Sequence, residues 1–185
     1  SAHQSIGVPQ PLLMYGTDYQ KERYLPMFAN GSVSAFALTE VDVGSDPSKL
    51  TTTAEKDNEG DYTLNGEKLW CTNGTKADVI IVMARTGKKI TAFIVEMNWP
   101  GVKVTHRSRF MGLKALYNGV VKFNNVRIPK ENIVLAEGKG MRVALNTLNI
   151  GRLTLPAICV GASKECLRMM REWTSTRSQW GQAIG

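Results

Sequence analysis

A run of short β-prone segments, separated by turn residues and without a helical pattern between them, is the feature that most constrains the fold. Residues 79–84 and 90–95 are apolar enough to be central strands, and residues 86–89 are typical of the turn between them. Residues 102–106 and 119–123 continue the series. Strands at this spacing, with no helices between them, predict an antiparallel sandwich or barrel.

A hairpin is predicted early in this β region. The dipeptide Asn65-Gly66 separates residues 61–64 from residues 67–70. Asn-Gly favours the positive φ values of a type I′ turn, so we expect the two segments to pair with each other.

Helical patterns flank the β region on both sides. Thr17 and Gln20 have the spacing of a capping box, which predicts a helix that ends at Asn30-Gly31. From residue 141 to residue 170, apolar side chains recur at helical spacing. Gly151 and Pro156 interrupt this pattern and predict a kink or a short break. The second helix is longer than the β region needs, so we expect its apolar face to contact further helices of a longer protein or of another subunit.

The composition excludes several classes of protein. In 185 residues, 43% are hydrophobic and 21% are charged, as in an ordinary globular protein, so disorder is not expected. The net charge of +7 is compatible with nucleic acid, an acidic membrane or a phosphorylated small molecule as partner, but charge alone favours a generally basic protein.

The cysteines and histidines also limit the chemistry. Cys71, Cys159 and Cys166 form no C-x-x-C pair, and only His3 and His106 accompany them, so neither a zinc cluster nor a disulfide scaffold is expected. A reducing compartment fits best, either the cytoplasm or the matrix of a mitochondrion. No apolar run long enough for a bilayer and no leader are recognised in the sequence.

The first candidate site is the polar loop at residues 38–46, LTEVDVGSD. Its acids Glu40, Asp42 and Asp46 lack the spacing of an EF-hand, so no metal site is predicted. Gly44 permits a close approach of the backbone to a ligand, and neighbouring hydroxyls offer donors. A solvated surface turn remains an equal alternative.

Two further constellations are candidates. Strand alternation places Trp70 and Thr72 on one face and Cys71 on the other, which would present an aromatic plane and a hydroxyl to a flat heteroaromatic ring. Spacing alone favours the alternative, a tryptophan in the core of a barrel. Arg152 lies at the helix interruption, and Arg177 lies three residues before Trp180-Gly181. Arginines near helix ends could bind phosphate groups, although a surface arginine or an ordinary ion pair is the alternative.

Together, these segments resemble the acyl-CoA dehydrogenase family. Residues 36–46, FALTEVDVGSD, are similar to its "TEPxxGSD" signature, with Val41 where the family usually has proline. Residues 62–74, YTLNGEKLWCTNG, are similar to its "YxxNGxKxWITNG" segment, with Cys71 in place of isoleucine. Further similar segments follow in the order of the family at residues 90–96, 111–114, 126–129, 149–152 and 177–181.

The resemblance implies an α+β fold in which an antiparallel β-barrel forms the middle domain. Residues 1–34 would be the end of an N-terminal helical domain, residues 35–138 the barrel, and residues 139–185 the first long helix of a C-terminal bundle. The chain is therefore expected to be a piece of a longer protein.

The resemblance also implies roles for individual residues. FAD contacts are expected from Phe36, Leu38, Thr39, Gly44, Ser45, Trp70, Thr72, Arg177 and Trp180. Acyl-CoA contacts are expected from Ser45, Asn149 and Arg152. The catalytic base is expected beyond Gly185, because Gly151 occupies the alternative position that some members use. This chain alone is therefore expected to be inactive.

The implied function is α,β-dehydrogenation of acyl-CoA thioesters in fatty acid β-oxidation. Electrons would pass to an electron-transferring flavoprotein, and the full-length protein would be a homo-dimer or homo-tetramer because Arg177 resembles an arginine that contacts the FAD of a neighbouring subunit. An acyl-CoA oxidase and a DNA-associated relative on the same scaffold are the alternatives, although a nucleic-acid partner is not favoured.

Overall fold

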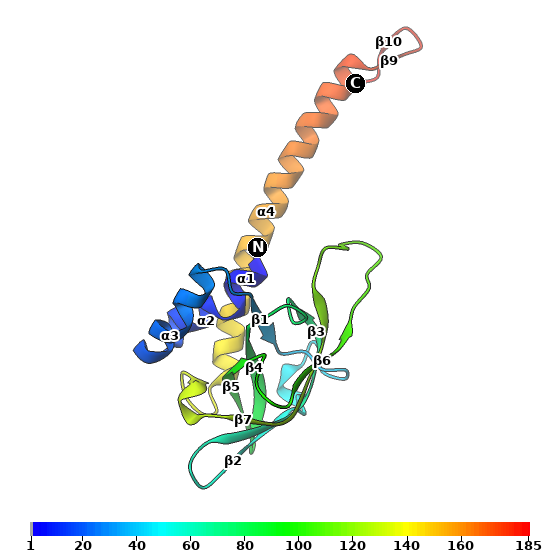
Figure 1. Cartoon of the computed structure of the whole chain (residues 1–185). Helices are drawn as coiled ribbons and strands as arrows, with labels where there is room; N and C mark the ends of the chain where they lie inside the picture. The colour runs from blue at the N-terminus through cyan, green and yellow to red at the C-terminus, as the bar shows by residue number, and fades with distance from the viewer. Residues whose placement is uncertain (1) are drawn as a thin grey trace. The chain divides into compact units, whose positions relative to one another are not determined.

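A computed structural model describes residues 2–185, which separate into two units, one ending at Leu148 and one beginning at Asn149 (Figure 1). The helical elements are α1 Ala2–Gly7, α2 Pro9–Tyr15, α3 Asp18–Ala29, η1 Pro47–Lys49, η2 Lys130–Asn132 and α4 Gly140–Thr176. The strands are β1 Ser34–Ala37, β2 Thr53–Lys56, β3 Tyr62–Thr72, β4 Val79–Thr86, β5 Lys89–Glu96, β6 Val102–Arg107, β7 Asn118–Ile128, β8 Ile133–Val134, β9 Ser178–Gln179 and β10 Gln182–Ala183.

One sheet of eight strands forms the body of the first unit. Its order is β6-β7-β3-β2-β4-β5-β8, and β1 pairs with β4 beside this path. The α+β class and the four predicted strands at 79–84, 90–95, 102–106 and 119–123 are confirmed. The barrel is not confirmed, because within residues 2–185 no pairing joins β6 to β8. The pairing is also not wholly antiparallel, because β1 runs parallel to β4.

The apolar run of β4 is explained by burial on both faces. Ile80 and Val82 face a core formed by strands, which includes Phe93 of β5. Ile81 and Met83 face a second core, in which residues of α2, α3 and the start of α4 cover the sheet. A strand buried on both sides needs apolar residues at successive positions, which removes the alternation that a half-exposed strand shows.

The predicted hairpin at Asn65-Gly66 is wrong. β3 runs through both residues, pairing with β2 on one side and with β7 on the other. Gly66 has a φ of +146°, and the register against β7 shifts between Leu64 and Gly66. A Cβ atom at this position would lie 2.5 Å from the Thr52 hydroxyl oxygen. The glycine is therefore required by a bulge and a close contact rather than by a turn.

The helix at residues 18–29 is confirmed with its capping box. The Thr17 hydroxyl accepts from the Gln20 amide, and the Gln20 side chain accepts from the Thr17 amide. The Gln20 side chain also donates to the carbonyl oxygens of Glu131 and Ile133, which fixes α3 to the segment before α4.

Helix α4 continues through the predicted interruption. Gly151 and Pro156 both lie inside its 37 residues, so the short break is wrong. Proline removes only one hydrogen bond of the ladder, and the neighbouring Thr154 hydroxyl donates to the carbonyls of Ile150 and Gly151.

The composition of α4 allows more than one environment. One 18-residue window has a mean hydropathy of 1.3, and by length and composition it could cross a membrane. Core helices of soluble proteins meet the same requirement. This property alone therefore does not decide what contacts its apolar side chains, and the expectation of no membrane span stays a prediction.

Candidate functional site

The polar loop that follows β1 is held against β3. The amide of Leu69 donates to the carbonyl oxygen of Thr39 at 2.8 Å. The Cys71 thiol lies 3.5 Å from the carbonyl oxygen of Phe36, and the Asn73 side chain donates to the Ser34 carbonyl at 3.0 Å. The segments 36–45 and 70–72, which are far apart in sequence, therefore lie side by side.

A buried ion pair lies beneath this loop. Lys68 is 0% exposed and Glu40 is 5% exposed, and the Lys68 ammonium lies 2.8 Å from the Glu40 carboxylate. The ammonium also donates to the Leu38 carbonyl at 3.2 Å. The other oxygen of Glu40 accepts from the amide and the hydroxyl of Thr51. The Thr52 amide donates to the oxygen that faces Lys68, at 3.0 Å.

The electrostatics of the pair favour its charged form. Burial raises the pKa of Glu40, but the hydrogen bonds from Lys68, Thr52 and Thr51 outweigh it and lower the pKa to about 2. Burial lowers the pKa of Lys68, while the hydrogen bond and the charge of Glu40 oppose this change.

The ion pair was missed from the sequence, although a signal existed. Lys68 occupies an inward-facing position of the β3 pattern that contains Tyr62 and Leu64. A lysine in a buried position requires an acidic partner, and this requirement points to one of the acids in the preceding loop.

The rest of the loop is more exposed. Glu40 and Val43 exchange two backbone hydrogen bonds, which close a tight turn around the exposed Asp42. Gly44 and Ser45 are exposed, and a Cβ atom added to Gly44 would meet no atom of the chain within 4 Å. The backbone here is open to a ligand, as the loop hypothesis requires.

An aromatic ledge, formed by Trp70, Thr72 and Phe110, lies beside this loop. Trp70 is 54% exposed, with its ring centroid 6.0 Å from that of Phe110. Thr72 is half-buried, whereas Cys71 is buried between them, so the predicted alternation is confirmed. The alternative of a core tryptophan is wrong.

Asn118 holds the ledge in place. Its side-chain nitrogen donates to the Trp70 carbonyl and to the Thr72 hydroxyl oxygen, both at 3.0 Å. This residue was not predicted, although an asparagine directly before the apolar run at residues 119–121 is visible in the sequence, and a buried asparagine requires hydrogen-bond partners.

Cys71 does not provide a nucleophile. Burial raises the pKa of its thiol to about 12, despite the opposing charge of Lys68. At neutral pH the side chain is a thiol and behaves as a small apolar residue.

A positively charged cavity adjoins the ledge. It has a volume of about 600 Å³ and includes Phe110 in its lining, together with the basic residues His106, Arg107, Arg109 and Lys114. No aspartate or glutamate occurs between residues 97 and 130 of the sequence. This local excess of positive charge attracts anionic ligands or partners.

The remaining predicted site residues belong to the second unit. The Arg152 guanidinium donates to the Asn149 side chain at 3.1 Å, so these two predicted substrate contacts touch each other. The Arg177 amide donates to the Trp173 carbonyl at the end of α4. Trp180 is 94% exposed and, with Gly181, forms the turn between β9 and β10.

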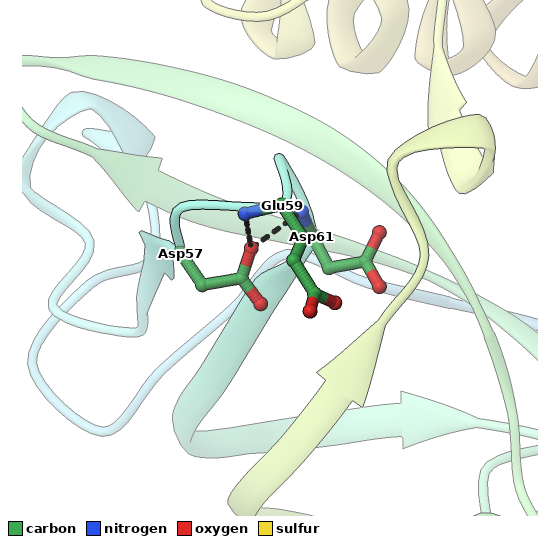
Figure 2. A group of neighbouring side chains, drawn as sticks. All are labelled: Asp57, Glu59 and Asp61. Carbon is green, nitrogen blue, oxygen red and sulfur yellow. Dashed lines mark hydrogen bonds between the residues drawn. The ribbon is translucent and has the colours of Figure 1, made fainter.

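An acidic cluster at the β2–β3 turn is structural. Asp57 accepts from the amides of Glu59 and Asp61, both at 2.9 Å (Figure 2). The Arg127 guanidinium lies 2.7 Å from Glu59 and 3.0 Å from Asp61, and the Lys130 amide donates to Asp61. These bonds close the turn and fix it to β7.

Comparison with known proteins identifies similar chains. The family model "acyl-CoA dehydrogenase, middle domain" matches residues 35–126, and the model "acyl-CoA dehydrogenase, C-terminal domain" matches residues 138–185. The probable acyl-CoA dehydrogenase FadE10 of Mycobacterium tuberculosis is 50% identical over 100% of this chain and 30% of its own length.

Two solved structures have the same fold. The butyryl-CoA dehydrogenase of Megasphaera elsdenii has a TM-score of 0.93 and 35% identity, over 99% of this chain and 49% of that one. An acyl-CoA dehydrogenase of Bacillus anthracis complexed with FAD has a TM-score of 0.91 and 40% identity, and the match covers 99% of this chain and 32% of that one. The chain thus spans between about 30% and 50% of the length of these relatives.

Proposed function

Because this chain belongs to the acyl-CoA dehydrogenase family, we propose that it is the flavin-binding part of an FAD-dependent enzyme that oxidises acyl-CoA thioesters. The observation that carries this proposal is the adjacency of loop 36–45 and the exposed Trp70. The two predicted signatures contribute to one surface, which presents an exposed aromatic plane and neighbouring hydroxyl groups to a flat heteroaromatic ring.

The donor set fits the isoalloxazine ring. The Thr72 oxygen already accepts a hydrogen bond from Asn118, so its own hydrogen is free to donate to a ligand. The carbonyl of Thr39 is occupied by Leu69, and among residues 2–185 no hydrogen bond of the Thr39 hydroxyl is formed. Trp70 would pack against the ring, and the two hydroxyls would orient its edge.

The bound FAD would supply the acceptor for the hydride that leaves the β-carbon of the substrate. The residues of this chain would bind and orient the ring and keep water from its covered face. Further cofactor contacts would come from Phe36, Leu38, Gly44 and Ser45.

The second unit would bind the phosphate-bearing ends of the ligands. We propose that Arg152 and Asn149 contact the acyl-CoA substrate, since guanidinium groups bind phosphate through paired hydrogen bonds. A substrate contact is proposed separately for Ser45 of the first unit. Arg177 and Trp180 would contact the FAD of a neighbouring subunit in a homo-dimer or homo-tetramer. An electron-transferring flavoprotein would receive the electrons, and the base would lie outside this chain.

The proposal is tested by mixing the full-length protein, loaded with FAD, with acyl-CoA thioesters in the absence of oxygen. We expect loss of the visible absorbance of the oxidised flavin. A protein that binds no FAD, or whose absorbance no acyl-CoA changes, would contradict the proposal. Rapid recovery of colour with oxygen alone would identify an oxidase instead. A polypeptide of residues 1–185 is expected to reduce no flavin in the same assay.

A further inference from the structure

The buried pair of Lys68 and Glu40 closes both ends of one loop onto one strand. The ammonium binds the Leu38 carbonyl, where the loop leaves β1. The carboxylate binds Thr51 and Thr52, where the loop returns to β2. One charged contact of 2.8 Å thus joins the entry and the exit of the loop to β3.

A pair of this kind is costly for a role in stability alone. Both groups are removed from water, and replacement of a buried ion pair by apolar side chains is often neutral or stabilising. An ion pair adds geometric specificity that apolar packing lacks, because its hydrogen bonds fix the positions of the bonded groups.

The Lys68–Glu40 ion pair lies beneath the proposed flavin surface. Thr39 stands between Leu38 and Glu40, both bonded to Lys68. Trp70 stands two residues beyond Lys68 on the same strand. The spacing between the loop donors and the tryptophan plane therefore depends on this pair.

We propose that Lys68 and Glu40 are positioning residues that set the distance between Thr39 and Trp70 and thereby the affinity for the flavin and its electronic environment. Neither residue touches the ligand. The inference rests on the proposed binding of FAD to this surface. It goes beyond that proposal because it assigns a role to two buried residues that are not among the proposed cofactor contacts.

The test uses the full-length protein, stripped of cofactor, and three forms of the pair: wild type, Lys68→Met, and the double variant Glu40→Gln/Lys68→Met. The dissociation constant of FAD, the positions of the visible flavin bands and the unfolding temperature are measured. A matched control replaces an exposed pair of the same residue types, Lys56→Met/Glu137→Gln, whose charged atoms lie 3.2 Å apart.

We expect Lys68→Met to weaken FAD binding by about tenfold or more and to shift the flavin bands, because the Leu38 carbonyl loses its donor. The double variant is expected to regain unfolding temperature, since it no longer buries an unpaired carboxylate, but to retain the weakened affinity and the shifted bands. The control should match the wild type in affinity and bands.

Recovery of affinity together with stability in the double variant would show that the pair only maintains the fold, and would overturn the inference. Wild-type affinity and bands in Lys68→Met would do the same. If Lys68→Met does not fold, the variant Thr51→Val tests the inference instead. Thr51 is exposed, and its hydroxyl donates to Glu40 at 2.7 Å, so the substitution removes one hydrogen bond of the pair without changing a buried residue. In that variant we expect about a twofold to threefold loss of affinity, and an unchanged affinity overturns the inference. A wild type that binds no FAD would overturn both this inference and the proposed function.

Discussion

Lys68 illustrates how the surroundings of a residue decide its role. A lysine within a strand usually directs its ammonium to solvent, but here the group is buried and donates two hydrogen bonds to the loop, to the Leu38 carbonyl and the Glu40 carboxylate. Its partner Glu40 belongs to a loop that looks, in sequence, like a solvated turn. The residue types are readable from the sequence, whereas their pairing across 28 positions is not.

The depressed pKa of Glu40 predicts a pH dependence of stability. The folded-state pKa of about 2 lies below the ordinary value of 4.5. Ionisation of Glu40 therefore stabilises the fold above pH 4.5, and this stabilisation is lost as the pH falls through 2.

The loss is expected to be at most about 3 kcal/mol. The measurement is the unfolding temperature of the full-length protein between pH 5 and 2, compared with the double variant Glu40→Gln/Lys68→Met. The unfolding temperature of the double variant should depend less on pH than that of the wild type. Glu137→Gln, which removes an exposed carboxylate, should retain most of the pH dependence of the wild type. Parallel profiles of wild type and double variant would contradict this assignment.

Thr72 is predicted to act on hydride transfer more than on binding. Its hydroxyl hydrogen is available because Asn118 supplies a donor to its oxygen. In the full-length enzyme, Thr72→Ala should slow flavin reduction by about tenfold or more, with a smaller change in the dissociation constant of acyl-CoA. Stopped-flow measurement of flavin absorbance separates the two quantities. An unchanged reduction rate would remove Thr72 from the site.

At the scale of elements, β3 is the strand on which the site depends. It extends over 11 residues, pairs on both sides, and has two register shifts against β7. The second shift lies between Lys68 and Cys71, where Trp70 has a φ of +53°. This irregularity places Trp70 at the surface while its neighbours remain in the sheet.

Gly66 is predicted to be essential for the first of these shifts. Gly66→Ala should destabilise the protein by about 2–4 kcal/mol, because the positive φ and the contact with Thr52 act together. The matched control is Gly87→Ala in the β4–β5 turn, where φ is +60° and no atom lies within 4 Å. That variant should lower the free energy of unfolding by only about 1 kcal/mol. Denaturant unfolding of both variants provides the comparison, and equal losses would contradict the packing argument.

At the scale of the whole molecule, the second unit exposes a large amount of apolar surface. Beyond Asn149, the exposed large apolar side chains of α4 are Leu153, Leu155, Ile158, Val160, Leu167, Met169, Met170 and Trp173. An exposed apolar surface of this extent marks a contact with other protein or with lipid.

A polypeptide of residues 1–185 is therefore predicted to self-associate. Sedimentation velocity at increasing concentration should show species larger than the 20.4 kDa monomer. The substitutions Leu155→Lys and Met169→Lys should reduce the association, because they place charge on the apolar surface. The same substitution at the exposed polar position Ser175, which α4 turns away from Leu155 and Met169, should not. A monomer at all concentrations would contradict this prediction.

Local patterns in the sequence determined the class of the fold and the segments that carry the site. Strand runs, the capping box and the two signatures depend on residues close together in the chain, so they could be identified without coordinates. The same local reasoning gave a hairpin at Asn65-Gly66 and a break at Pro156, because it could not include the strands and carbonyls that surround these residues in space.

Only the tertiary structure decided the open sheet, the parallel pairing of β1 with β4, and the burial of Lys68 against Glu40. Each depends on contacts between residues distant in sequence. The pairing partner of a strand and the partner of a buried charge are fixed by the free energy of the whole packed arrangement, and no short segment contains that information.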